Sequence, residues 1–310
     1  MIGKEYMSRS GYFKKNLNGK LSFQSFVPTK LGDIVIDYSE ELVNRLILVA
    51  NKIGYLNGCF SMLTKEEQRT IIDDCLMEEI KSSLDLAIYD ANFQNNFIPF
   101  GLDDEVKYRE TNNREHIEFI NLTDAYRFAI DRRKEIPICG RYFQEIHQIV
   151  RSDPKYEDKS PGWFRTSPNW IGTKEANLNT AYFVPPVNDD MVEAITDLEK
   201  YIHSENNQNR LIKAALIHYQ FEVIHPFLDA NGRIGRILNL IYLLEFHCID
   251  APIISLSSEL NIGRNTYYQM IKNVEEYGNY EEWIQLYLKC MNSAIQQTID
   301  KCMSLYEARK

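Results

Sequence analysis

Apolar residues recur at helical spacing along most of this chain. The first long run, SEELVNRLILVANKIGYLNG from Ser39, keeps a period of about 3.6 residues, and Gly58 offers a stop near its end. Similar spacing continues to Ala91 and returns in REHIEFINLTDAYRFAIDRR and CGRYFQEIHQIV. Further periodic runs fill most of the chain after residue 190. The pattern predicts an all-α protein.

Two segments interrupt the helical pattern. Residues 93–107 contain Asn, Pro and Gly without any period, which indicates a surface excursion and a candidate boundary. Residues 160–186 combine aromatic and β-branched residues with Gly and Asn, a composition typical of a short β-hairpin. We therefore expect one hairpin between helices.

The composition predicts a globular protein and does not support nucleic-acid binding. A chain of 310 residues with 44% hydrophobic and 25% charged residues can bury a large core. The formal net charge of −9 repels a phosphate backbone, and no long basic run offsets it. No winged-helix signature follows residue 300, so DNA binding is not supported.

Cysteine spacing and hydropathy indicate a protein of the cytoplasm. The six cysteines form no C-x-x-C pair, which argues against a zinc ribbon or a redox motif. No run of about 18 apolar residues is present, and the N-terminal MIGKEYMSRSGYFKK lacks an apolar signal region. We therefore expect a cytoplasmic location without a membrane span.

A polar segment, HPFLDANGRIGR at 225–236, lies between two apolar helical runs. Pro226 ends the first run, because proline lacks an N–H group and disfavours a helical residue before it. Asn231 and Gly232 precede the second run, whose unpaired N–H groups and positive dipole end face the loop. This arrangement predicts an anion site that suits a phosphate.

The side chains of the same loop suit a metal-bound polyphosphate. Arg233 and Arg236 lie three residues apart on the second helix and offer two guanidinium forks for phosphate oxygens. Asp229 supplies the hard oxygen ligand that Mg²⁺ prefers when the ion also bridges phosphates. His225 can accept a hydroxyl proton near neutral pH.

The loop resembles the signature of the Fic (filamentation induced by cyclic AMP) domain, H-x-F-x-D/E-G-N-G-R-x-x-R. The resemblance extends to residues 160–186, which look like the family's hairpin flap, and to the helices that follow. It implies a Fic-type helical bundle with a short β-hairpin flap, an N-terminal Fic-associated helical region at 1–100, a Fic core with following helices at 101–300 and a tail at 301–310. The matching positions are His225, Phe227, Asp229, Asn231, Gly232, Arg233 and Arg236, whereas Ala230 departs from the family's glycine.

By resemblance, the protein is an enzyme that transfers AMP from ATP to a Ser, Thr or Tyr hydroxyl of a target protein. His225 would be the general base, Asp229 would hold Mg²⁺, and Phe227 would anchor the loop in the core. The nucleotide-binding residues would be Ala230, Asn231, Gly232, Arg233 and Arg236. The oligomeric state, the target and the nucleotide preference stay open.

Two alternatives remain at this point. The same loop could transfer UMP, phosphocholine or phosphate, and similar DAN loops occur in the Doc relatives, which phosphorylate. Those relatives usually lack the glycine and the last arginine, whereas Gly232 and Arg236 are present here. A non-catalytic adaptor that binds nucleotide or peptide is disfavoured because His225 and Asp229 are intact.

Further residues are assigned by position within the resemblance. Tyr267 and Tyr268 are candidates for stacking on adenine, although aromatic residues at helical spacing are more often core. His218 is expected to pack or hydrogen-bond within its helix. Target docking by strand addition is assigned to three flap residues, Ile171, Gly172 and Tyr182.

The family's inhibitory helix, S/T-x-x-x-E-G/N, has no full match in this chain. In that helix the glutamate pairs with the second arginine of the loop. The aligned segment EEIKSSLDLAIYDAN places Leu86 where the glutamate would stand. Arg236 is therefore expected to be available to the γ-phosphate, unless Asp85 or Glu115 acts as a substitute inhibitory carboxylate.

Overall fold

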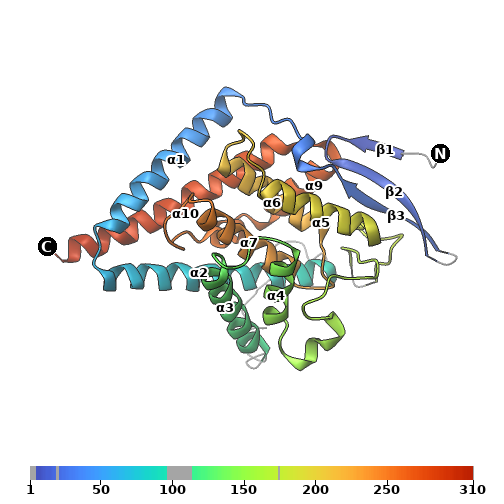
Figure 1. The fold of residues 1–310 in the computed structure, drawn as a ribbon, viewed down its shortest axis with the longest axis horizontal. Coiled ribbons are helices and arrows are strands. Elements are labelled where there is room, and N and C mark those ends of the chain that lie inside the picture. Colours follow the sequence, from blue (N-terminus) through green and yellow to red (C-terminus); the bar gives the residue numbers. More distant parts are fainter. Residues whose placement is uncertain (1–4, 19–20, 96–113, 174, 310) are drawn as a thin grey trace, which may run out of the picture.

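The computed structural model describes residues 5–18, 21–95, 114–173 and 175–309, and it is predominantly helical (Figure 1). Helices dominate the described chain, so the predicted fold class is confirmed. The helices are α1 (Glu40–Ser61), α2 (Lys65–Asn95), α3 (Arg114–Arg132), α4 (Gly140–Val150), α5 (Asn188–Ile202), α6 (Arg210–Ile224), α7 (Asn231–Glu245), α8 (Leu256–Ile262), α9 (Arg264–Tyr277) and α10 (Tyr280–Ala308), with two short 3₁₀ turns at Leu31–Asp33 and Pro154–Lys159.

Helices α6 and α7 form the centre of the fold. Nearly every residue of both helices is buried, including polar ones such as His218 and Asn239. A helix that is apolar on all sides is stable only when other elements surround it. Accordingly, α6 packs against α5, α7 and α10, while α7 also contacts α2, α3 and α4. The polar loop between α6 and α7 is therefore held at both ends by helices that are packed on all sides.

A three-stranded antiparallel sheet precedes the helices, and the helical pattern did not predict it. Its strands are β1 (Glu5–Ser8), β2 (Gly11–Asn18) and β3 (Leu21–Pro28), in the order β1-β2-β3. A signal for it does exist in the sequence, because Asn-Gly at 18–19 is a common turn dipeptide of β-hairpins. In β3, Phe23 is buried between exposed Ser22 and Gln24, which is the alternation of a half-buried strand.

The N-terminal helices pack onto the C-terminal one. Helix α1 begins next to Ser39, as predicted, and the Ser39 hydroxyl caps it by accepting a bond from the Leu42 N–H (3.3 Å). The helix continues past Gly58 to Ser61. It lies along α10, and α10 continues through residue 300 to Ala308 (Figure 1). Part of the excursion predicted at 93–107 lies outside the described residues. The division at 100 and 300 stays a prediction.

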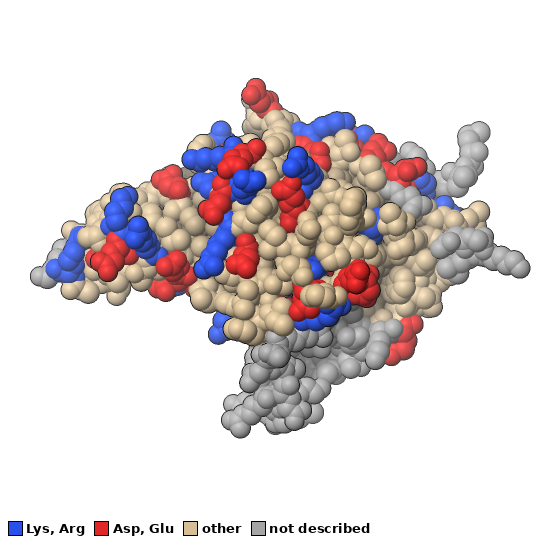
Figure 2. Space-filling model, turned by 60° about the horizontal axis from the view of Figure 1, so that its bottom comes forward, with Lys and Arg blue, Asp and Glu red and all other residues tan. Residues whose placement is uncertain are grey.

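The hydropathy of the helices and the charge on the surface are two further features of the described chain. In the described part of the chain, no helix is both long and apolar enough to span a membrane. On the face shown in Figure 2, acidic and basic side chains are interspersed and do not gather into one basic patch. The surface in that view gives no support to nucleic-acid binding.

Candidate active site

The loop between α6 and α7 is bounded by two residues in the left-handed conformation. His225 caps the C-terminus of α6 with φ 49° and ψ 59°, and Ala230 precedes α7 with φ 64° and ψ 11°. An alanine in this region costs about 1–2 kcal/mol because its Cβ crowds the backbone. The loop thus adopts a backbone suited to glycine even though residue 230 is alanine, and the core on both sides holds it there.

Asn231 and Phe227 fix the loop from inside. The Asn231 side chain accepts a bond from the Phe227 N–H (2.8 Å) and donates one to the Phe227 carbonyl (2.9 Å). The Phe227 ring is buried and stacks on His147, with ring centroids 4.0 Å apart. Phe227 therefore is the core anchor that the motif predicts, and Asn231 ties the loop to the start of α7.

The ring of His225 is set up to accept a proton. Its Nδ1 lies 3.2 Å from the Glu222 carbonyl oxygen, which can only accept, so Nδ1 carries the hydrogen and Nε2 keeps its lone pair. Burial, together with the neighbouring Arg165 charge, lowers the pKa of His225 to about 4. The ring is thus neutral at pH 7, in the form that a general base requires.

Asp229, whose side chain is partly exposed, belongs to a network of mostly buried charges. Its Oδ1 accepts a bond from the Ala230 N–H (2.6 Å), and its Oδ2 accepts one from Arg151. Burial acts to raise the pKa of Asp229, but the charges of Arg151 and Arg233 outweigh it and hold that pKa below its usual value. Glu118, on α3, completes the network at 3.8 Å from Arg151 and 3.5 Å from Arg233. Asp229 is therefore an ionised carboxylate at pH 7.

The two arginines of α7 are both buried but have different partners. Arg233 lies 3.7 Å from Asp229, and burial lowers its pKa to about 10, which leaves it charged at pH 7. Arg236 donates from Nε to the Ser83 hydroxyl and from Nη2 to the Ser83 carbonyl, each at 2.8 Å. Arg236 thus bonds to serine oxygens of α2, a contact that the sequence did not predict, and its availability to the γ-phosphate stays a prediction.

The other residues considered for inhibition are Leu86, Asp85 and Glu115. Leu86 is fully buried in the core, so its side chain packs and does not face the phosphate site. Asp85 is partly buried on the same helix, and the Glu115 side chain lies outside the described side chains. An inhibitory role for Asp85 or Glu115 stays a prediction.

The two tyrosines proposed for adenine lie next to each other on α9. Tyr267 is 1% exposed, and its hydroxyl lies 3.0 Å from Nε2 of the buried His218. The ring of Tyr268 is partly buried, with its centroid 4.8 Å from that of Tyr267. His218 thus has the packing and hydrogen-bonding role expected of it, and adenine stacking stays a prediction.

The hairpin predicted within residues 160–186 forms one bridge, between Ile171 and Phe183, and not a regular strand pair. We use the word flap below for residues 167–186, which contain this bridge. The Ile171 N–H donates to the Phe183 carbonyl, and the Tyr182 N–H donates to the Ile171 carbonyl, both at 2.8 Å. On its other side the flap meets the N-terminal sheet, since the Phe26 N–H of β3 donates to the Val184 carbonyl (2.8 Å). Gly172, next to this bridge, is buried, and its N–H and carbonyl point away from residues 182 and 183.

Comparison with known proteins identifies this arrangement. A family model described as the Fic/DOC family matches residues 137–243, which include α4, the flap, α6 and the loop. The chain has a Fic/DOC domain. Its fold is similar to a Fic family protein from Desulfovibrio desulfuricans (TM-score 0.64, 17% identity, 86% of this chain and 76% of that one) and to Fic-1 from Caenorhabditis elegans (TM-score 0.59, 18% identity, 87% and 76%).

Curated relatives match the Fic/DOC domain and part of the chain before or after it. Protein adenylyltransferase fic-1 of Caenorhabditis briggsae is 26% identical over 194 residues, which are 60% of this chain and 34% of that protein. Protein adenylyltransferase Fic of Drosophila yakuba is 29% identical over 58% of this chain and 34% of its own length. The chain thus spans about a third of the length of these relatives.

Sequence reasoning missed three residues of the Fic/DOC site. Arg151 follows α4, Glu118 lies on α3, and Arg165 precedes the flap, so none belongs to the loop motif. Each is a charged residue with a mostly buried side chain, but no local pattern marks it as such. Only the packing of α3 and α4 against α7 brings the first two to Asp229 and Arg233.

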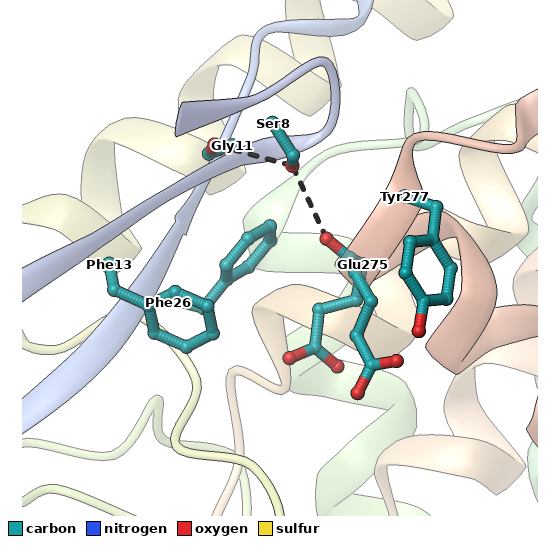
Figure 3. A pocket seen from close by; sticks show the side chains of 7 residues that line it. Ser8, Gly11, Phe13, Phe26, Glu275 and Tyr277 are labelled. Carbon is teal, nitrogen blue, oxygen red and sulfur yellow. Dashed lines mark hydrogen bonds between the residues drawn. The ribbon is translucent and has the colours of Figure 1, made fainter. Parts of the chain in front are cut away.

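A separate cavity of about 260 Å³ lies between the N-terminal sheet and α9 (Figure 3). Its lining includes Ser8, Phe13, Phe26 and Glu275, and the Ser8 hydroxyl donates to the Glu275 carbonyl (3.3 Å). Burial raises the pKa of the Glu275 side chain to about 8. No residue assigned to the Fic/DOC loop lines this cavity, so it is not part of the candidate active site.

Proposed function

We propose that this protein is an adenylyltransferase that moves AMP from ATP to a Ser, Thr or Tyr hydroxyl of another protein. The observation that carries the proposal is the neutral His225, with its Nε2 lone pair available as a base, at one end of a loop that leads into α7. The relatives named protein adenylyltransferase support the same activity. The cytoplasm is the proposed compartment, because all six cysteines are unpaired thiols.

The proposed reaction is a single displacement at the α-phosphorus of ATP. His225 Nε2 takes the proton from the acceptor hydroxyl as the oxygen bonds to the α-phosphorus. The bond from that phosphorus to the bridging oxygen breaks, and pyrophosphate leaves. The N–H groups at the start of α7 and the charge of Arg233 would bind the phosphates. The Asn231 and Arg233 side chains at this end of the helix are buried, so the ligand-free structure already holds them in place.

Asp229 fits a magnesium ion that arrives with the nucleotide. Among the described residues, no group of three or more His, Cys, Asp or Glu side chains is placed to hold a metal. Mg²⁺ bound through phosphates typically needs only one or two protein carboxylates, and the ionised Asp229 side chain is 37% exposed. The ion would neutralise charge on the phosphates. Asp229 would then hold the ion in place of its hydrogen bond with Arg151. Arg151 would still have the Glu118 carboxylate as a partner.

Intact-protein mass spectrometry after incubation with ATP and Mg²⁺ tests the proposal. We expect the mass of one adenylate group to be added to the protein itself or to a protein in a mixed acceptor pool. Addition of phosphate alone would favour the Doc-type alternative. No addition to any protein with ATP, together with addition from UTP or CDP-choline, would replace the AMP assignment with one of the other phosphate-linked groups.

The flap offers a direct test of target docking. Ile171 directs both its N–H and its carbonyl toward the second flap strand, so those of Gly172 point to the opposite side, which is the proposed docking edge although Gly172 is buried in the ligand-free protein. An acceptor segment that adds a strand there would need the Gly172 N–H. Gly172→Pro should therefore lower transfer to a protein target by about ten-fold, the cost of about one hydrogen bond, without changing ATP affinity.

Crowding at Gly172 requires a matched control. A Cβ at this position would lie 2.7 Å from the Ala176 Cβ, so any substitution moves the flap to some extent. Gly172→Ala adds that Cβ but keeps the N–H. If Gly172→Ala and Gly172→Pro lose equal activity toward the target, the effect comes from crowding, and the docking role is wrong.

A further inference from the structure

Arg165 joins the loop of His225 to both ends of the flap. Its guanidinium is buried, at 3% exposure, and donates from Nε to the His225 carbonyl (2.8 Å). The same group donates to the carbonyls of Ser167 and Pro186, the first and last residues of the flap. The Arg165 backbone N–H donates to the carbonyl of Pro226 (2.9 Å). One side chain thus holds two segments that meet at the proposed reaction centre.

The carbonyl groups at the C-terminal end of α6 favour a positive charge, which Arg165 supplies. The last carbonyls of a helix have no partner within the helix, and they form the negative end of its dipole. Arg165 donates to the carbonyl of Ile224 (3.3 Å) as well as to that of His225. Burial lowers the pKa of Arg165 to about 10, so it is still charged at pH 7 and matches these carbonyls.

We propose that Arg165 is a positioning residue that sets the distance between the acceptor edge of the flap and His225. This inference rests on the proposed function. Among the described residues, the Arg165 side chain donates to backbone carbonyls alone. It would act through His225, which would contact the acceptor hydroxyl. Its planar fork spans carbonyls of the flap and of α6 at once, whereas the ammonium group of a lysine concentrates its donors at one point. The position of the acceptor relative to His225 therefore depends on the fork, and not only on the positive charge.

Arg165→Lys separates positioning from folding. The variant keeps a buried cation at the end of α6 and should remain folded, with ATP affinity within about two-fold of wild type. A displacement of about 1 Å between reacting groups can cost about a hundred-fold in rate, so AMP transfer to a protein acceptor should fall by about ten- to a hundred-fold. AMP transfer to water, which needs no docking on the flap, should change by less than about three-fold. The ratio of the two rates is the measurement.

Three outcomes of this experiment are informative. A fall in the ratio for Arg165→Lys, with unchanged ATP affinity by calorimetry, supports the proposal. Equal losses in both rates would show that Arg165 is structural only. If wild-type protein transfers AMP to neither acceptor, the proposed function fails, and amide hydrogen exchange then tests Arg165 independently of activity.

Hydrogen exchange reports on the same coupling in the absence of turnover. In wild type the N–H groups of Ile171 and His225 are bonded, to the carbonyls of Phe183 and Phe221. In Arg165→Lys and in Arg165→Met, both N–H groups should exchange at least about ten-fold faster, while Ile217 in the middle of α6 keeps its protection. Unchanged exchange at Ile171 and His225 in a folded variant would overturn the proposal.

Discussion

His225→Ala should lower the rate of AMP transfer by about 10²–10⁴-fold, because general-base assistance contributes a factor of that size. ATP affinity should stay within about two-fold, since the phosphates are bound by the start of α7 and by Arg233. The backbone change is small, although alanine at a left-handed position keeps a strain of about 1–2 kcal/mol. Rates at saturating ATP, together with ATP titrations by calorimetry, measure the two effects separately.

The chain provides a matched control for this substitution. His247 is also left-handed, with φ 54°, but it is exposed and follows the C-terminal end of α7. His247→Ala therefore repeats the change of side chain and backbone strain beyond the C-terminus of α7, at the end of that helix farther from the loop, and should leave transfer unchanged. If His225→Ala also abolishes ATP binding, His225 holds the loop together and is not the base.

Ser83→Ala should strengthen ATP binding by about ten- to a hundred-fold. In the ligand-free protein the Ser83 hydroxyl accepts a bond from Arg236 Nε (2.8 Å), and a hydrogen bond to a charged group is worth about 1.5–3 kcal/mol. Removing the hydroxyl leaves a buried donor on Arg236 without this partner, and a phosphate oxygen of ATP can then satisfy it. Calorimetric titration with ATP measures the affinity. Thermal unfolding should show a lower Tm without ATP and a larger ATP-induced rise than in wild type.

The neighbouring serine is the control for the Ser83 experiment. Ser82 lies on the same helix and is partly buried, so Ser82→Ala removes an equivalent hydroxyl next to the one that contacts Arg236. It should leave ATP affinity unchanged. Weaker ATP binding in Ser83→Ala would mean that Ser83 holds Arg236 in its binding position, and α2 would then support the site instead of restraining it.

Leu86→Glu is a poor way to install an inhibitory carboxylate in this chain. Leu86 has no exposed surface and packs in the main core, so a glutamate there must either bury its charge or displace α2. An unpaired buried charge costs several kcal/mol, which would obscure any effect on ATP binding. The alignment of the serines with the family pattern located the correct helix, but the contact with Arg236 comes from Ser83, three residues earlier.

The sequence by itself determined the helices and the chemistry of the loop between α6 and α7. Both depend on residues that are close in the chain: a period of apolar positions defines each helix, and Pro226 with the start of α7 confines the polar loop. The roles suggested for His225 and Asp229 follow from their place in one short polar segment, residues 225–236. The hairpin of β2 and β3 was missed although Asn-Gly at 18–19 is a local signal.

Only the tertiary structure decided which distant groups complete the site. Along the chain, Arg165 is 60 residues from His225, and Arg151 is 78 residues from Asp229. Ser83 is 153 residues from Arg236 of α7. A guanidinium can pair with a carboxylate, a hydroxyl or a carbonyl, and the sequence does not say which of these will face it. That choice follows from how α2, α4 and the flap pack around α7, since burial forces each charge to take the nearest available partner.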